Sequence, residues 1–97
     1  MKLKIHELAR MEFEDAIEWY DLQSTGLGER FKRTVLEQLR TVRQHPGWYV
    51  REDASVFVAY IPKFPYKIYY TFDEEQLVVW AIAHMHRKPF YWQERVK

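Results

Sequence analysis

The sequence contains one nearly continuous apolar run, which a histidine follows: Leu77-Val78-Val79-Trp80-Ala81-Ile82-Ala83-His84. A short run without polar alternation predicts a strand that other elements cover on both faces, so it belongs in the interior of a sheet. The run is far shorter than the ~20 residues that a membrane-spanning helix needs. We therefore expect a central strand here and arrange the rest of the chain around it.

Three further segments have the composition of strands. Residues 2–6 alternate polar and apolar side chains, and residues 55–61 and 66–72 are rich in Val, Ile, Tyr and Phe. Pro62 and Pro65 cannot donate a ladder hydrogen bond, so they bound strands and do not lie within one. A short polar turn after residue 72 predicts a hairpin between that strand and the central one.

Apolar residues at helical spacing predict two amphipathic helices, over residues 7–23 and 27–44. Ser24-Thr25-Gly26 separates them, and Pro46-Gly47 ends the second. Helices with so short a break between them form an αα-hairpin. We expect the acidic residues of the first helix on a solvent-exposed face: Glu12, Glu14, Asp15, Glu18 and Asp21.

The order of these elements gives the fold class. One strand, two helices and three strands (β-αα-βββ) predict an α+β fold in which the helical hairpin packs on a small, mainly antiparallel sheet. The chain has 97 residues, about the length of one ordinary domain, so we expect a single domain over residues 1–97.

Composition excludes several classes of protein. The chain has no cysteine, which excludes a disulfide scaffold, a thiolate zinc site and a cysteine nucleophile. Its 15 Lys and Arg against 14 Asp and Glu give a net charge of +1, so it is neither polybasic nor polyacidic. The first residues lack the apolar core of a signal peptide. We expect a cytoplasmic protein that does not bind membranes.

The densest group of polar and aromatic side chains, residues 84–95, directly follows the central strand. Arginine pairs with phosphate, and tyrosine and tryptophan rings stack on bases. Histidine or tyrosine can move a proton to or from a ribose hydroxyl or a leaving oxygen. These groups could bind RNA and cleave it without a metal ion. In the alternative interpretation, Tyr91 and Trp92 cover an edge between helices and sheet, and Arg87 pairs with a carboxylate of the first helix.

Two other features have a structural and a functional interpretation. His84 and His86 would share one face of a continuing strand, but a metal site needs three or four ligands and no third one is nearby in the sequence. Lys67 and Tyr69 alternate with Tyr66, Ile68 and Tyr70. We expect Lys67 and Tyr69 on the open face of the sheet, where Lys67 would contact phosphate or would simply be solvated.

The whole chain resembles the RelE/ParE toxin superfamily of bacterial type II toxin–antitoxin systems, and among its members especially the plasmid stabilisation proteins. The resemblance rests on the order of short motifs: Tyr20, Gly26-Leu27-Gly28-Glu29-Arg30-Phe31, His45-Pro46, Lys63-Phe64-Pro65-Tyr66-Lys67-Ile68-Tyr69-Tyr70 and His84-x-x-Arg87-x-Pro89-x-Tyr91-Trp92-x-x-Arg95. It implies a growth-inhibiting toxin without a cofactor. It also implies a partner antitoxin that wraps a groove beside the helical hairpin, to which Met11, Trp19 and Trp48 could contribute.

The resemblance also implies two alternative targets. RelE-like members cut mRNA on the ribosome. In that case Arg87 and Lys67 would stabilise phosphate charge and His84 or Tyr91 would move protons. Further cations would bind the RNA: Lys63, Lys88 and Arg95. ParE-like members inhibit DNA gyrase without nuclease residues.

The chain departs from the nuclease pattern in two respects. Its 56–61 segment lacks the lysines and arginines usual in nuclease members, and its net charge of +1 is small for docking on ribosomal RNA. Both departures count against the nuclease interpretation without favouring gyrase. Cleavage of mRNA stays the first expectation, with gyrase inhibition close behind it and a detoxified interaction module third.

Overall fold

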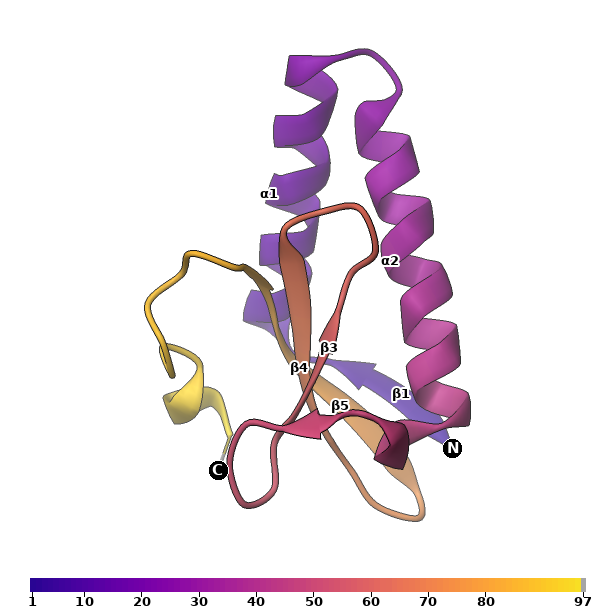
Figure 1. Cartoon of the computed structure of the whole chain (residues 1–97), viewed down its shortest axis with the longest axis vertical. Coiled ribbons are helices and arrows are strands. Elements are labelled where there is room, and N and C mark those ends of the chain that lie inside the picture. Colours follow the sequence, from indigo (N-terminus) through magenta and orange to yellow (C-terminus); the bar gives the residue numbers. More distant parts are fainter. Residues whose placement is uncertain (97) are drawn as a thin grey trace.

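The computed structural model describes residues 1–96, and its N-terminal half contains the two predicted helices. Helix α1 covers Glu7–Gln23 and helix α2 covers Leu27–Gln44, in agreement with the sequence pattern. Figure 1 shows the two helices side by side, with the turn that links them extending past the sheet. Gly26 takes a φ of 87° in this turn, a conformation that glycine adopts without steric cost. No helix in residues 1–96 is both long and apolar enough to cross a membrane.

The sheet has five strands in the order β1-β5-β4-β3-β2. Their bounds are Lys2–Ile5 for β1, Val50–Arg51 for β2, Phe57–Tyr60 for β3, Tyr66–Phe72 for β4 and Gln76–His84 for β5. Strand β1 runs parallel to β5, and every other pair is antiparallel.

The α+β class and the helical hairpin on a mainly antiparallel sheet are thus confirmed, and the apolar run is an interior strand. Two details differ from expectation. The two-residue strand β2 was not predicted, and β3 is shorter than residues 55–61. Short 3-10 turns follow α2 (Pro46–Trp48) and close the C-terminal segment (Gln93–Arg95).

The main core lies between the helices and one face of the sheet. Its fully buried side chains include Phe31 and Val35 of α2 and Ile68 and Tyr70 of β4. Aromatic rings pack edge to face here, as with Phe31 and Tyr66 at 5.0 Å between centroids. The expected division of β4, with Ile68 and Tyr70 beneath the helices, is therefore correct.

The other face of the sheet carries a second, smaller core, and this corrects an expectation. Tyr69 does not lie on an open face, because Trp92 of the C-terminal segment covers it at 4.8 Å between ring centroids. Trp92 is 1% exposed and also packs with Ala81 and Ala83. The structural interpretation of Trp92, as an aromatic side chain that covers part of the sheet, is thus confirmed.

Candidate functional site

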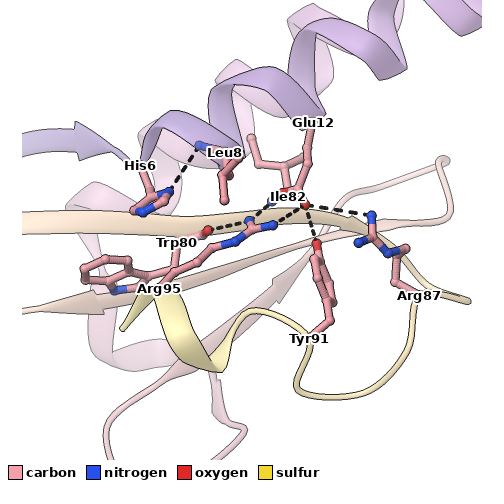
Figure 2. Close-up of polar contacts among 8 residues, drawn as sticks. All are labelled: His6, Leu8, Glu12, Trp80, Ile82, Arg87, Tyr91 and Arg95. Atoms are coloured by element: carbon pink, nitrogen blue, oxygen red, sulfur yellow. Dashed lines mark hydrogen bonds and ion pairs between the residues drawn. The ribbon is translucent and has the colours of Figure 1, made fainter. Parts of the chain in front are cut away.

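Glu12 of α1 is the centre of a polar cluster that joins α1, β5 and the C-terminal segment (Figure 2). Its Oε1 accepts hydrogen bonds from Arg95 Nη1 at 3.0 Å and from the backbone N–H of Ile82 at 3.1 Å. Its Oε2 accepts from the Tyr91 hydroxyl at 2.8 Å and from Arg95 Nη2 at 2.9 Å. Arg87 Nη1 lies 3.9 Å from the same oxygen. We call these residues the Glu12 cluster: Glu12, Ile82, Arg87, Tyr91 and Arg95.

The Glu12 cluster forms where β5 extends beyond the end of its neighbour β1. The last residue of β1, Ile5, pairs with Val79, so the following part of β5 has no partner strand on that side. The carboxylate of Glu12 accepts the N–H of Ile82, and Arg95 Nη1 donates to the Trp80 carbonyl at 3.0 Å. Two side chains therefore satisfy backbone groups that a strand would otherwise pair.

Arg95 and Arg87 are held very differently. The Arg95 side chain is 12% exposed and makes a bidentate pair with the carboxylate of Glu12, itself 15% exposed. The side chain of Arg87 is 52% exposed, and its guanidinium stacks on the Tyr91 ring at 3.9 Å. A buried bidentate pair has fixed geometry, whereas an exposed stacked arginine can still turn toward an incoming anion. Of these two arginines, Arg87 is thus the one that a ligand can reach.

Tyr91 is placed as a hydrogen-bond donor and not as a base. Burial raises the pKa of its hydroxyl well above the usual value, and the hydrogen bond and negative charge of Glu12 raise this pKa further. The positive charges of Arg87 and Arg95 oppose that shift without cancelling it. Tyr91 is therefore neutral near pH 7, with its proton directed at Glu12.

His84 ends β5 and faces a pocket of about 280 Å³ between the strand and α1. Arg87, Trp19 and Tyr66 line the same pocket. The Nδ1 atom of His84 accepts the backbone N–H of His86 at 3.1 Å. In the neutral ring Nε2 therefore carries the proton, so this nitrogen is a donor and cannot accept a proton without a tautomer change.

The remaining predicted cations lie elsewhere. Lys67 projects from the face of β4 opposite to Tyr66, with Nζ 5.2 Å from the ring centre of Tyr69. Lys63 lies in the loop between β3 and β4 and borders a hollow beside α2. Lys88 is exposed in the C-terminal segment. The structure thus brings four predicted residues together at the end of β5 (His84, Arg87, Tyr91 and Arg95) and leaves these three lysines outside.

The expectation that all acidic residues of α1 are solvated is wrong for Glu12. A signal for its burial exists in the sequence, because Glu12 lies three residues after the buried Ala9 and four before the buried Ala16. It therefore shares their helix face and points at the sheet. Asp21 is exposed but also has a structural partner, since its Oδ1 accepts the N–H of Gly28 at 2.8 Å.

The three apolar residues proposed for an antitoxin groove are all exposed. Met11 and Trp19 lie on α1, while Trp48 stacks on His45 at the far end of α2, 3.6 Å between ring centroids. Residues 1–96 contain no group of three His, Cys, Asp or Glu side chains close enough to hold a metal ion.

Comparison with known proteins gives a match in structure alone. No protein-family model matches the chain, and no curated protein matches its sequence. Among solved structures it is similar to a chain of the chromosomal ParDE toxin–antitoxin system of P. aeruginosa, with a TM-score of 0.76 and 14% sequence identity. The match covers 87% of this chain and 95% of the other. The protein therefore has the RelE/ParE-like fold that its motif order predicts.

Proposed function

We propose that this protein is the toxin of a type II toxin–antitoxin system and inhibits growth unless an antitoxin binds it. The observation that supports this most is the likeness of nearly the whole chain to a ParDE structure, at a TM-score of 0.76. The order of family motifs along the sequence supports the same assignment independently.

The outer face of α1 is the surface that best fits the antitoxin. Leu22 is 76% exposed and Trp19 is 54% exposed, so two large apolar side chains of one helix face solvent. A hollow of about 440 Å³ beside Leu22 is rimmed by Glu14, Glu18 and Asp21. An apolar floor with an acidic rim matches an amphipathic segment that carries lysine or arginine.

For the mode of inhibition, the Glu12 cluster favours binding of gyrase over cleavage of RNA. Cleavage needs free cations for the phosphate and a group that exchanges a proton. The Glu12 carboxylate already neutralises Arg95 and accepts the hydrogen bond of the Tyr91 hydroxyl. The net charge of +1 also gives little attraction to ribosomal RNA. Inhibition by binding requires none of these groups to be free.

Cleavage of mRNA remains the second candidate because of one pocket. His84 and Arg87 line it together, and Arg87 is exposed enough to contact a phosphate there. In this scheme the 2′-hydroxyl of the RNA would attack the phosphorus and lose its proton to water, while the bond from phosphorus to the 5′-oxygen breaks. Arg87 would stabilise the phosphate, and His84 Nε2–H would donate its proton to the leaving 5′-oxygen and regain one from water. Lys67, on the opposite face of the sheet from Tyr66, would not take part.

The test is induced expression in cells that lack the antitoxin, comparing wild type with Arg87→Ala. Growth arrest with loss of plasmid supercoiling, intact mRNA and little effect of Arg87→Ala supports gyrase inhibition. New mRNA ends by primer extension, abolished by Arg87→Ala but kept by the exposed helix variant Arg40→Ala, support cleavage. Normal growth at full expression of folded protein would refute the toxin proposal and leave a detoxified interaction module.

A further inference from the structure

The face of the sheet away from the helices carries a further pocket, beyond the part that Trp92 covers and away from the Glu12 cluster. It has a volume of about 340 Å³ and lies on β1, β5 and β4. Register places Lys4, Val78 and Thr71 in one row across these three strands, so their side chains share a face. Leu3 and Ile5 point into the main core, which confirms that Lys4 projects to the opposite side.

A β-bulge places a tryptophan at this pocket. Tyr69 pairs with Ala81 and Tyr70 pairs with Val79, so Trp80 is the extra residue between two ladder pairs. Bulges of this kind re-aim a side chain and are frequent beside functional sites. Trp80 therefore shares with its neighbour Ala81 the face of the sheet away from the helices, and unlike Ala81 it is only partly buried.

Neighbouring side chains hold the Trp80 ring in place. Its Nε1–H donates to the Thr71 hydroxyl at 2.9 Å, and the His6 ring lies 5.7 Å away between centroids. Nδ1 of His6 accepts the N–H of Leu8 at 3.1 Å, which leaves Nε2–H as the free donor of the neutral ring. Figure 2 shows His6 and Trp80 close together, with the Trp80 ring set apart from Arg87 and Tyr91.

The pocket thus combines a flat aromatic surface with a cation and several hydrogen-bonding groups. Lys4 is exposed at its rim, and the Asp73 carboxylate and Gln76 amide complete the lining. Stacking on an aromatic ring beside a lysine is the combination by which proteins bind nucleotides without sequence readout. A pocket of this volume has room for one planar base and its phosphate.

We propose that this pocket binds a nucleotide, with the base on Trp80 and the phosphate at Lys4 and His6 Nε2–H. Of the other polar groups that line the pocket, the Gln76 amide is available to the edge of the base, whereas Asp73 Oδ1 already accepts the backbone N–H groups of Glu75 and Gln76. The ligand is either a free nucleoside monophosphate or one unit of a single strand, since both present the same base and phosphate. The inference does not depend on the toxin assignment.

The test uses purified full-length protein with AMP, GMP, CMP and UMP, and separately with a mixed-sequence RNA hexamer. Binding is followed by the amide and indole N–H signals of ¹⁵N-labelled wild type. We expect a nucleotide to shift the indole signal of Trp80 together with the amides of Lys4 and His6, while those of Arg87 and Tyr91 stay in place. Inorganic phosphate alone should bind at least tenfold more weakly.

Variants separate this site from non-specific binding. Trp80→Leu should weaken nucleotide binding at least tenfold, while Trp48→Leu, at an exposed tryptophan elsewhere, should leave it unchanged. Because Trp80→Leu could fail to fold, Lys4→Ala at an exposed position is the second test and should also weaken binding, unlike Lys32→Ala on α2.

Hexamer binding tenfold tighter than any monophosphate identifies a strand as the source, and equal affinity identifies the free nucleotide. No Trp80 shift at 10 mM monophosphate or saturating hexamer, or equal binding by Lys4→Ala, overturns the proposal.

Discussion

At the scale of single residues, Glu12 has the greatest influence on the candidate site, because one carboxylate serves three elements. It joins α1 to the edge of β5 through Ile82 and to the C-terminal segment through Tyr91 and Arg95. A partly buried carboxylate with several charge-assisted hydrogen bonds is costly to remove, since its partners stay behind unpaired.

The first prediction concerns this charge. Glu12→Gln removes the negative charge but keeps the shape, so Arg95 becomes a buried cation without a counterion. We expect a loss of about 2–4 kcal/mol in the free energy of unfolding, measured by urea denaturation. Glu18→Gln, at an exposed position of the same helix, is the matched control and should leave the denaturation midpoint unchanged. Equal effects of the two substitutions would show that Glu12 is merely solvated.

The C-terminal segment is attached at a second residue, Trp92. Its side chain is 1% exposed in the smaller core, and its indole N–H has no hydrogen-bond partner among residues 1–96. The attachment therefore depends on the apolar surface of the ring and not on its nitrogen.

The second prediction follows from this packing. Trp92→Ala should cost about 3–5 kcal/mol because it leaves a large cavity over Tyr69. Trp92→Phe should cost clearly less, since it keeps an aromatic ring and removes an unpaired donor. Urea denaturation measures both losses, and limited proteolysis of the 85–91 segment should be faster in the alanine variant only. Similar losses in the two variants would contradict this account.

At the scale of elements, the helical hairpin depends on a close approach at Gly28 of α2. A Cβ at this position would lie 2.4 Å from the carbonyl oxygen of Ile17 and 2.7 Å from the side chain of Asp21, both on α1. The backbone of α1 cannot yield as a flexible side chain could, so only glycine fits between the helices here.

The third prediction tests this contact. Alanine is the better helix former by about 1 kcal/mol, so propensity alone predicts that Gly28→Ala stabilises the protein. We expect the opposite sign, a net loss of about 1–3 kcal/mol, because overpacking against backbone forces the helices apart. Gly47→Ala is the control, since its nearest neighbour lies 4.0 Å away. A higher melting temperature for Gly28→Ala would disprove the close approach.

The elements themselves could be predicted from the sequence to a large extent, because local signals define them. Apolar periodicity, the Gly26 break and Pro46 mark both helices, and the apolar run marks β5. Strand β2 could not be predicted, since two exposed residues show no periodicity. The bulge at Trp80 was also hidden, because a bulge depends on how two strands pair and not on either strand alone.

The candidate site was less predictable for a related reason. Proximity along the chain correctly grouped His84, Arg87, Tyr91 and Arg95, which all follow one strand. The structural interpretation of Arg87, as a partner of a carboxylate on the first helix, is confirmed by its contact with Glu12. The sequence did not reveal that this carboxylate, about 80 positions away, also binds Tyr91 and Arg95. Long-range pairing of this kind neutralises one of the two arginines, Arg95, and engages the phenol of Tyr91 in a hydrogen bond, while Arg87 stays exposed.

At the scale of the whole molecule, stability should depend on pH through its buried tyrosines, and Tyr70 gives the clearest case. It is 0% exposed, and its hydroxyl donates to the carbonyl of Pro46. Burial, with a smaller contribution from Tyr49, raises the pKa of Tyr70 far above its usual value. The folded state therefore keeps this proton at a pH where the unfolded chain, with a tyrosine pKa near 10, releases it.

The sign of the last prediction follows from this difference. The contribution of Tyr70 to stability is fully present below about pH 10 and declines above it, by up to about 1.4 kcal/mol per pH unit, as unfolded tyrosine ionises. Tyr70→Phe should cost about 1 kcal/mol at pH 7 for the lost hydrogen bond. That deficit should shrink or reverse by pH 11, because the variant has no phenol here to ionise on unfolding. Urea denaturation from pH 7 to 11 measures the difference in the free energy of unfolding between wild type and Tyr70→Phe. Tyr60→Phe, at an exposed position, should follow the wild-type curve, and a deficit for Tyr70→Phe that stays constant with pH would refute the prediction.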